Sequence, residues 1–267
     1  MLEPLPRLTP PRRPPAAFAR HLPPSAAFQW LRAGWRDFRT GLWSSLGHGL
    51  VLLALSAGVL LVLRAAGLLY LALPAMAGFL IVGPFMALGL YRKSHILAAG
   101  GRPGMAATLV PHIESGGQIA YAGLLLGLLV LFWLRAADLL YALFFGLSPF
   151  PGAADALHNV LTSPRGWALI VVGGLVGALF ASFAFAISLF SLPMMMEERR
   201  DALTAMGMSF AMTAQNLLPV LVWGMIVSCG LLLSLATGLL GLVVVFPVLG
   251  HATWHAYRAV WCGEVRP

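Results

Sequence analysis

The sequence predicts an all-α fold: a polytopic integral membrane protein with six transmembrane helices in a bundle, plus interfacial amphipathic helices. Composition is the first evidence, because the chain is 60% hydrophobic and only 10% charged, whereas an average soluble domain is roughly 25% charged. Residues 202–257 also contain no charged side chain, and one crossing needs only about 20 apolar residues. Backbone groups in hydrocarbon must be satisfied internally, so segments of this kind cross the membrane as helices.

The N-terminal segment, residues 1–25, is rich in proline and arginine and is predicted to be a disordered cytoplasmic tail. Proline lacks a backbone donor and arginine resists burial, so neither favours a packed core. No apolar core of a signal peptide is visible in it, so nothing predicts cleavage or export. A docking arm for a partner or for anionic lipid is the alternative. A short cytoplasmic tail, residues 259–267, is predicted at the other end.

Residues 26–43 predict an amphipathic helix that lies in the membrane interface. Five apolar side chains recur at helical spacing and form one stripe, with arginines on the flank and the far side. The stripe consists of Phe28, Leu31, Trp35, Phe38 and Leu42. Aromatic residues on one face and arginines on the other are typical of a helix parallel to the membrane. Docking against another subunit is the alternative interpretation.

The transmembrane domain, residues 44–258, is predicted to hold six crossings. Their expected ranges are 47–63, 67–90, 119–134, 167–192, 217–236 and 239–254. Gly83 and Pro84 are expected to kink the second crossing. Residues 91–117 and 148–164 are predicted to be loops, residues 139–147 to lie along the outer interface, and residues 194–216 to contain a solvated charge run followed by a second interfacial helix.

The distribution of basic residues predicts the orientation. With six crossings both termini share one side, which receives 14 of the 17 lysines and arginines, while only Arg64, Arg135 and Arg165 fall on the other. Basic residues collect on the cytoplasmic side of membrane proteins. The sequence therefore predicts cytoplasmic N- and C-termini. The same rule accounts for the formal charge of +8 without a nucleic-acid partner.

Four runs of residues resemble those of a known family. They are residues 33–39 (AGWRDFR), 77–92 (AGFLIVGPFMALGLYR), 190–194 (FSLPM) and 249–258 (LGHATWHAYR). In order and type they are similar to a bacterial family of predicted integral membrane proteins, domain-of-unknown-function family 2189. The resemblance implies a bacterial inner-membrane location and an association with the respiratory chain. The family has no assigned catalytic or binding residues, so none is transferred.

His251 and His255 are the only candidates for a metal or haem site. Their i, i+4 spacing on the last predicted helix places both imidazoles on one side. Hydrogen bonding to backbone carbonyls or lipid headgroups is the alternative. The sequence shows no nucleophile with a base and an acid orienter, no paired carboxylates and no phosphate-binding loop, so no enzyme activity and no cofactor are predicted.

The function predicted from these features is that of a non-catalytic accessory or assembly subunit of a larger membrane complex. Its predicted partners are membrane lipids and other membrane-protein subunits, with self-association left open. Small residues along residues 173–188 suit close helix packing. A small-molecule or lipid transporter or channel is the alternative, weakened because the predicted crossings hold no ionisable residue near their centres.

Overall fold

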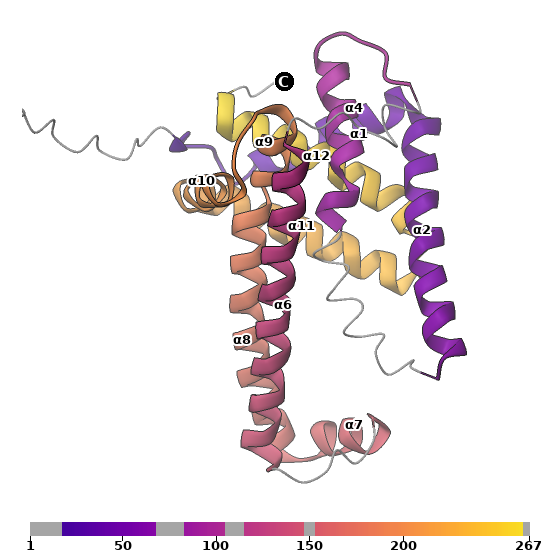
Figure 1. Cartoon of the computed structure of the whole chain (residues 1–267), viewed down its shortest axis with the longest axis vertical. Helices are drawn as coiled ribbons and strands as arrows, with labels where there is room; N and C mark the ends of the chain where they lie inside the picture. The colour runs from indigo at the N-terminus through magenta and orange to yellow at the C-terminus, as the bar shows by residue number, and fades with distance from the viewer. Residues whose placement is uncertain (1–17, 68–82, 105–114, 147–152, 264–267) are drawn as a thin grey trace, which may run out of the picture.

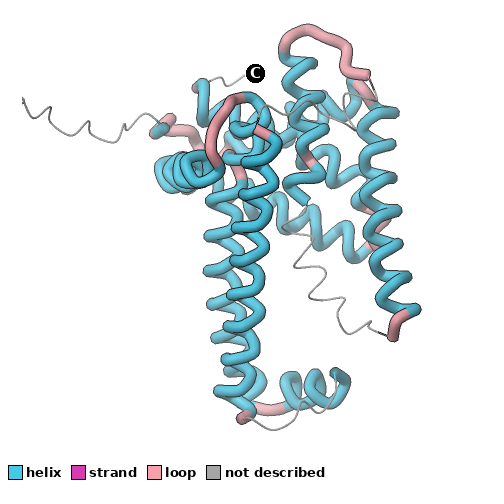
Figure 2. Tube along the Cα trace, viewed as in Figure 1, coloured by secondary structure: helices cyan, strands magenta, loops and turns pink. Residues whose placement is uncertain are grey.

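The computed structural model describes residues 18–67, 83–104, 115–146 and 153–263, and helices are the only regular secondary structure within these ranges (Figure 2). In chain order they are α1 (Ala26–Thr40), α2 (Leu42–Ala65), α4 (Leu88–Ala98), α6 (Gly116–Phe145), α7 (Ala153–Thr162), α8 (Pro164–Ser188), α9 (Ser191–Glu197), α10 (Ala202–Gln215), α11 (Leu217–Ala236) and α12 (Leu242–Cys262). The predicted all-α class is confirmed for the part of the chain that is described.

Four helices are long and apolar enough to cross a membrane. They are α2, α6, α8 continued into α9 (Pro164–Glu197), and α11. Only 6% to 22% of the residues in their most apolar windows are buried inside the protein. An apolar surface of that extent suits lipid and not water. These helices coincide with the predicted first, third, fourth and fifth crossings, so the chain is a membrane protein with several apolar helices.

The other two predicted crossings are not confirmed. Most of the second, residues 67–90, lies outside the described residues. The sixth, residues 239–254, corresponds to α12, which does not rank among the four helices. Only the first half of α12 is uniformly apolar, and the second half carries His251, His255 and Arg258. Its burial differs too, because most of α12 lies in the interior instead of facing outward.

The long helices α2, α6 and α8 run in roughly the same direction, whereas α11 and α12 lie obliquely between them (Figure 1). Helices α6 and α8 form an antiparallel pair with α7 across one end, and α2 stands on the opposite side of the molecule. Helix α10 is seen end-on, so it runs across the direction of α6 and α8. Helix α12 lies in the interior, where it contacts α1, α2, α4, α9 and α11.

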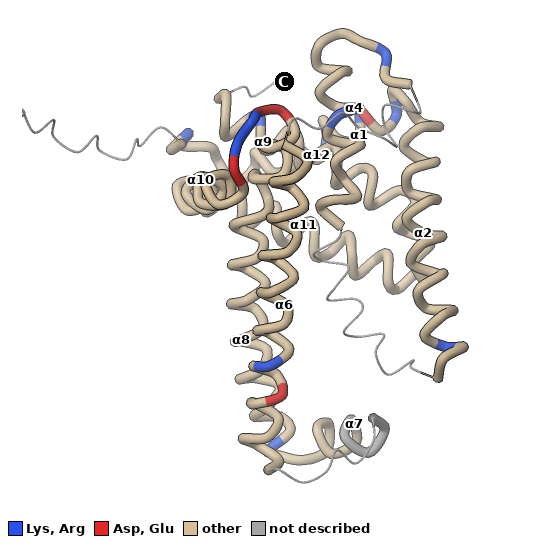
Figure 3. The backbone as a smooth tube through the Cα atoms, viewed as in Figure 1, with Lys and Arg blue, Asp and Glu red and all other residues tan. Residues whose placement is uncertain are grey.

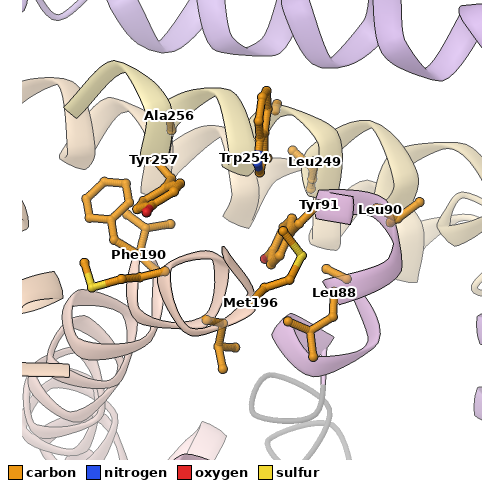
Figure 4. Packing of buried hydrophobic residues seen from close by; sticks show 14 of the residues in the cluster. Leu88, Leu90, Tyr91, Phe190, Met196, Leu249, Trp254, Ala256 and Tyr257 are labelled. Carbon is orange, nitrogen blue, oxygen red and sulfur yellow. The ribbon is translucent and has the colours of Figure 1, made fainter. Parts of the chain in front are cut away.

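The core gathers around α12 and the short α9 at one end of the molecule. Figure 4 shows Phe190 and Met196 directed towards Tyr257 and Tyr91. Phe190 and Tyr257 are fully buried, as are the three consecutive methionines of α9. Methionine is unbranched and fills irregular gaps between helices. The methionine run therefore serves to pack the core.

Two predicted loops contain helix instead. Residues 91–98 of the first predicted loop belong to α4 (Leu88–Ala98), because no glycine or proline lies between Leu90 and Gly100, whose φ of +79° ends the run. Residues 153–162 form α7 within the second predicted loop. The predicted outer segment, residues 139–147, also differs, since α6 continues unbroken to Phe145. The Arg135–Asp138 pair (3.3 Å) lies on the surface of that helix, where the i, i+3 spacing allows it.

The predicted N-terminal interfacial helix is present as α1, but its faces differ from the prediction. Phe28 is 60% exposed and Trp35 45% exposed, whereas Phe38 of the same stripe is buried. A second face, which includes Trp30 and Gly34, packs against α12. Helix α1 ends at Thr40, short of the predicted end at residue 43, and α2 begins two residues later, at Leu42. The face of α1 that contacts α12 is thus rich in small residues, and most of the predicted aromatic stripe lies on the protein surface.

The last residues of the predicted N-terminal tail contact the helical core. Arg20 donates from Nε to the Val260 carbonyl (2.9 Å) and from Nη2 to the Trp261 carbonyl (2.8 Å). Phe18 stacks on Trp261 with ring centroids 5.7 Å apart. A cation at a helix C-terminus satisfies its last carbonyls and its dipole. Phe18 and Arg20 therefore pack on the end of α12, which itself extends to Cys262, into the predicted C-terminal tail. Residues 1–17 lie outside the described part.

Charged residues are distributed unequally between the two ends of the molecule (Figure 3). Most lie around α1, α4 and α9, and few lie at the opposite end, near α7 and the end of α2. Arg64 is in the last turn of α2 and Arg165 follows the first residue of α8. This segregation agrees with the division of basic residues counted from the sequence.

The contact between α1 and α12 yields a prediction. A Cβ on Gly34 would lie 2.6 Å from both the Cβ and the backbone nitrogen of Ala252. We expect Gly34→Ala to lower the free energy of unfolding by about 1–3 kcal/mol, because backbone atoms cannot yield to the added methyl group. Thermal unfolding in detergent measures this change.

The matched control is Gly207→Ala in α10, where an added Cβ meets nothing within 4 Å. This substitution should raise stability by roughly 0.5–1 kcal/mol, as expected for glycine replaced by alanine in a helix. A Gly34→Ala protein at least as stable as the Gly207→Ala protein would contradict the close α1–α12 contact.

Candidate functional site

A buried lysine is the centre of the candidate site. Lys93 is the single lysine among 17 basic residues, and no part of it is exposed. Its Nζ donates to the carbonyl of Gly41 (2.6 Å) and to Oγ of Ser45 (2.5 Å). Gly41 joins α1 to α2, and a Cβ there would lie 2.6 Å from the Lys93 Nζ. The glycine therefore leaves the room that the ammonium occupies.

A histidine continues the network from Ser45. His251 is completely buried on α12, with Nε2 2.9 Å from Oγ of Ser45 and Nδ1 2.8 Å from Oγ of Ser94. Ser94 follows Lys93 on α4 and lies close enough to the Asp37 carboxylate on α1 to lower its pKa. Four helices thus meet in one polar chain, which we call the Lys93–Asp37 network: Lys93, Ser45, His251, Ser94 and Asp37.

Asp37 and His255 form the outer end of this network. Oδ2 of Asp37 lies 2.8 Å from Nε2 of His255, and the two side chains are 13% and 15% exposed. Burial pushes the pKa of Asp37 up, but the hydrogen bond with His255, the electrostatic attraction of His255 and the proximity of the Ser94 hydroxyl outweigh it. The pKa of Asp37 is lowered overall. At neutral pH the outer end of the network is therefore a carboxylate.

The inner end of the network is a weakened base. Burial lowers the pKa of Lys93 to about 8, although the Asp37 carboxylate opposes part of this shift. An arginine in the same place would stay charged, since its guanidinium does not lose its proton in proteins. Unlike arginine, lysine can therefore change charge here near neutral pH.

A helix interruption lies beside this network. Residues 83–86 are helical, the chain turns at Ala87, and α4 begins at Leu88. The backbone nitrogen of Leu90 donates to Ala87 instead of Met86, so the Met86 carbonyl is available, and Nε2 of His48 lies 2.6 Å from it. The His48 ring nitrogen thus takes the place of the missing backbone donor to the Met86 carbonyl. The break falls three residues after Pro84, where the sequence predicted a kink.

A second polar cluster surrounds Glu197 of α9. Its Oε1 accepts from Trp254 Nε1 (2.9 Å) and lies 2.8 Å from His95 Nδ1, and its Oε2 is 3.9 Å from Arg258. Only 9% of the Glu197 side chain is exposed. The sequence analysis assigned Glu197 to a solvated charge run, and that assignment is wrong. The carboxylate joins α4, α9 and α12.

The structure places the two predicted metal candidates in one polar network. Three of their four ring nitrogens, both of His251 and Nε2 of His255, have serine or aspartate partners. Among the described residues no group of three or more His, Cys, Asp or Glu is arranged to hold a metal ion. Metal or haem ligation by His251 and His255 stays an untested prediction.

Sequence patterns alone do not reveal the residues that connect the histidines. They place Lys93 in a loop and Asp37 on the far side of an interfacial helix, yet both are buried. One signal was available, because a chain that uses arginine at every other basic position has a single lysine. Asp37 is likewise the only acidic residue between Glu3 and Glu114.

Comparison with known proteins agrees with the class that the fold defines, an integral membrane protein. The model of a family described as predicted integral membrane protein (DUF2189) matches residues 71–197. This match confirms the family resemblance, and it includes two of the four runs on which that resemblance was based, residues 77–92 and 190–194. No curated protein and no solved structure matches the chain.

The weakened base gives a prediction about stability and pH. The pKa of Lys93 is about 8 in the folded protein, against about 10.4 in an unfolded chain. Between these values the unfolded state binds more protons, so stability should rise with pH, by roughly 1–3 kcal/mol in total. Unfolding midpoints measured from pH 7 to pH 10 test this rise.

Lys93→Met is the control, because it keeps the length of the side chain and removes the titration. Burial raises the pKa of Tyr91 and Tyr257, and both would lower stability at high pH in either protein. The difference between the two proteins isolates Lys93. If wild type and Lys93→Met give parallel curves, the lowered pKa is refuted.

Proposed function

We propose that this protein is a non-catalytic accessory or assembly subunit that acts through contacts with other proteins in the bacterial inner membrane. The observation that carries the proposal is a stripe of small residues on the exposed face of α8. Gly174, Ala178 and Ser182 recur every four residues, and all three are exposed. Small residues at this spacing let membrane helices approach closely.

The other face of α8 shows what such residues do when a partner is present. A Cβ on Gly177 would lie 2.9 Å from the Trp133 ring of α6, so the pair already uses that glycine for close packing. By contrast, an added Cβ on Gly174 meets nothing within 4 Å. The chain itself fills one small-residue face of α8 and leaves the second available to another helix. This second face supports contacts with another subunit or another copy.

The proposal includes the membrane placement predicted from the sequence. Six crossings with both termini in the cytoplasm put α1, α4 and α9 at the cytoplasmic end and α7 at the outer end. The segregation of charged residues between these ends supports this orientation (Figure 3). The exposed aromatic residues of α1, such as Phe28 and Trp35, suit the interface at the cytoplasmic end.

A transporter or channel is the second candidate, and one observation favours it. The interruption at Ala87 lies beside Lys93 and His48, which are both buried. Interrupted helices near buried polar groups occur at the binding sites of carriers. Proteoliposomes that show flux of an ion, small solute or lipid would favour this candidate over a subunit that works by contact alone.

Purification from native membranes in mild detergent, followed by mass spectrometry, tests the accessory-subunit proposal. We expect a stoichiometric membrane-protein partner. Gly174→Leu should reduce recovery of that partner by about tenfold or more, because the added side chain holds the two helices apart and costs about 1.4 kcal/mol or more of association.

Gly58→Leu in α2 is the matched control. An added Cβ at Gly58 also meets nothing within 4 Å, on a different helix. This variant should recover the partner as the wild type does. A protein that purifies alone, or a Gly174→Leu variant that keeps its partner, would refute the role assigned to this face of α8.

A further inference from the structure

The polar groups of the Lys93–Asp37 network can be ordered in one direction. The Asp37 carboxylate can only accept and lies close enough to Ser94 for this hydroxyl to lower its pKa, which orients the Ser94 proton towards Asp37. Ser94 has a single proton, so Nδ1 of His251 must donate to it (2.8 Å). His251 is fully buried and close to an ammonium, which disfavours a second positive charge, so its Nε2 accepts from Ser45 (2.9 Å). Lys93 in turn donates to Ser45.

Each of the three groups between the ends can both give and take a proton. Ser45 and Ser94 are hydroxyls, and His251 has a nitrogen on each side. The Oγ atom of Ser45 lies 2.5 Å from Lys93 Nζ and 2.9 Å from His251 Nε2. On the other side of the ring, His251 Nδ1 lies 2.8 Å from Ser94 Oγ. These lengths are those of good hydrogen bonds. A proton can therefore pass along the chain without any group leaving its place.

We propose that these five residues form a proton relay, through which the buried Lys93 exchanges its proton with solvent at the Asp37–His255 end. This activity is independent of the accessory-subunit proposal, since it needs no partner. Lys93 itself has no exposed surface, while the side chains at the other end are 13% and 15% exposed. The relay gives the lysine a route that direct contact with water does not.

The proton transfer balances atom by atom. The N–H bond of Lys93 breaks as its proton binds Oγ of Ser45, and the original proton of Ser45 moves to Nε2 of His251. The Nδ1 proton of His251 moves to Ser94, whose own proton moves to Asp37 and then to water. Lys93 becomes a neutral amine, both serines remain hydroxyls, and Asp37 is again a carboxylate. His251 ends with its proton on Nε2 in place of Nδ1.

The residue types support a relay over a purely structural network. A structural cation at this place would be served by arginine, which the chain uses at all its other basic positions and which does not release its proton. The titratable groups that face the relay are Asp37 from α1, His48 from α2 and His255 from α12. Helix α9 directs Glu197 to His95 and Trp254 instead.

Nuclear magnetic resonance on the full chain in lipid nanodiscs tests the relay. With one lysine in the sequence, ¹³Cε-labelled lysine gives a single side-chain signal, that of Lys93. Labelling histidine with ¹⁵N and comparing with His251→Gln assigns the two nitrogens of His251. We expect His251 to change from the Nδ1–H to the Nε2–H tautomer over the same pH interval in which Lys93 loses its proton. A His251 tautomer that stays constant while Lys93 titrates would overturn the proposal.

Two variants distinguish proton transfer from structural support. Lys93→Arg keeps a cation that cannot release its proton, so His251 should remain the Nδ1–H tautomer at every pH. Ser94→Ala interrupts the relay, and exchange of the Lys93 amine protons with water should slow by at least tenfold. Ser234→Ala is the control, because Ser234 is buried and its hydroxyl donates to the Gly230 carbonyl of the same helix, α11. Exchange in Ser94→Ala as fast as in Ser234→Ala would refute the route through Ser94.

Discussion

The arrangement of one end of the molecule depends on the burial of a single ammonium group. A charged group removed from water needs polar partners, since an unpaired buried charge is very costly. Lys93 obtains them from the α1–α2 junction, at Gly41 and Ser45. Helix α4 is thereby fixed against both α1 and α2. Because Ser45 also bonds His251, the requirement of one lysine positions α12 as well.

Close backbone contact makes this polar arrangement possible. Gly34 and Gly49 bring α1 and α2 against α12, where any side chain at either glycine would collide with backbone atoms of α12. Helices that approach so closely let short side chains such as serine reach across the interface. The close approach at the glycines and the hydrogen bonds of the polar network thus join the same helices.

The molecule combines two environments that follow different physical rules. Towards the end marked by α7, the helices expose leucine, valine and phenylalanine, and lipid is the solvent that this surface fits. Around α9 and the second half of α12, the protein interior holds paired charges, tryptophans and tyrosines. This division explains why a chain with an outward apolar surface also has a dense polar core. It also places the two proposed activities in different parts of the molecule: contact with partner subunits at the exposed face of α8, and proton transfer in the Lys93–Asp37 network.

The sequence by itself determined the membrane class, the helical fold and four of the spanning helices, because these depend on local composition and on the need to satisfy backbone groups in hydrocarbon. It also determined that α1 is a separate amphipathic helix. Only the tertiary structure decided that α12 is a buried central helix and that α4 replaces a predicted loop. It alone connected Asp37, Lys93 and His251, which lie far apart in the chain. Periodicity describes one helix at a time, whereas a hydrogen bond between helices depends on how their faces meet.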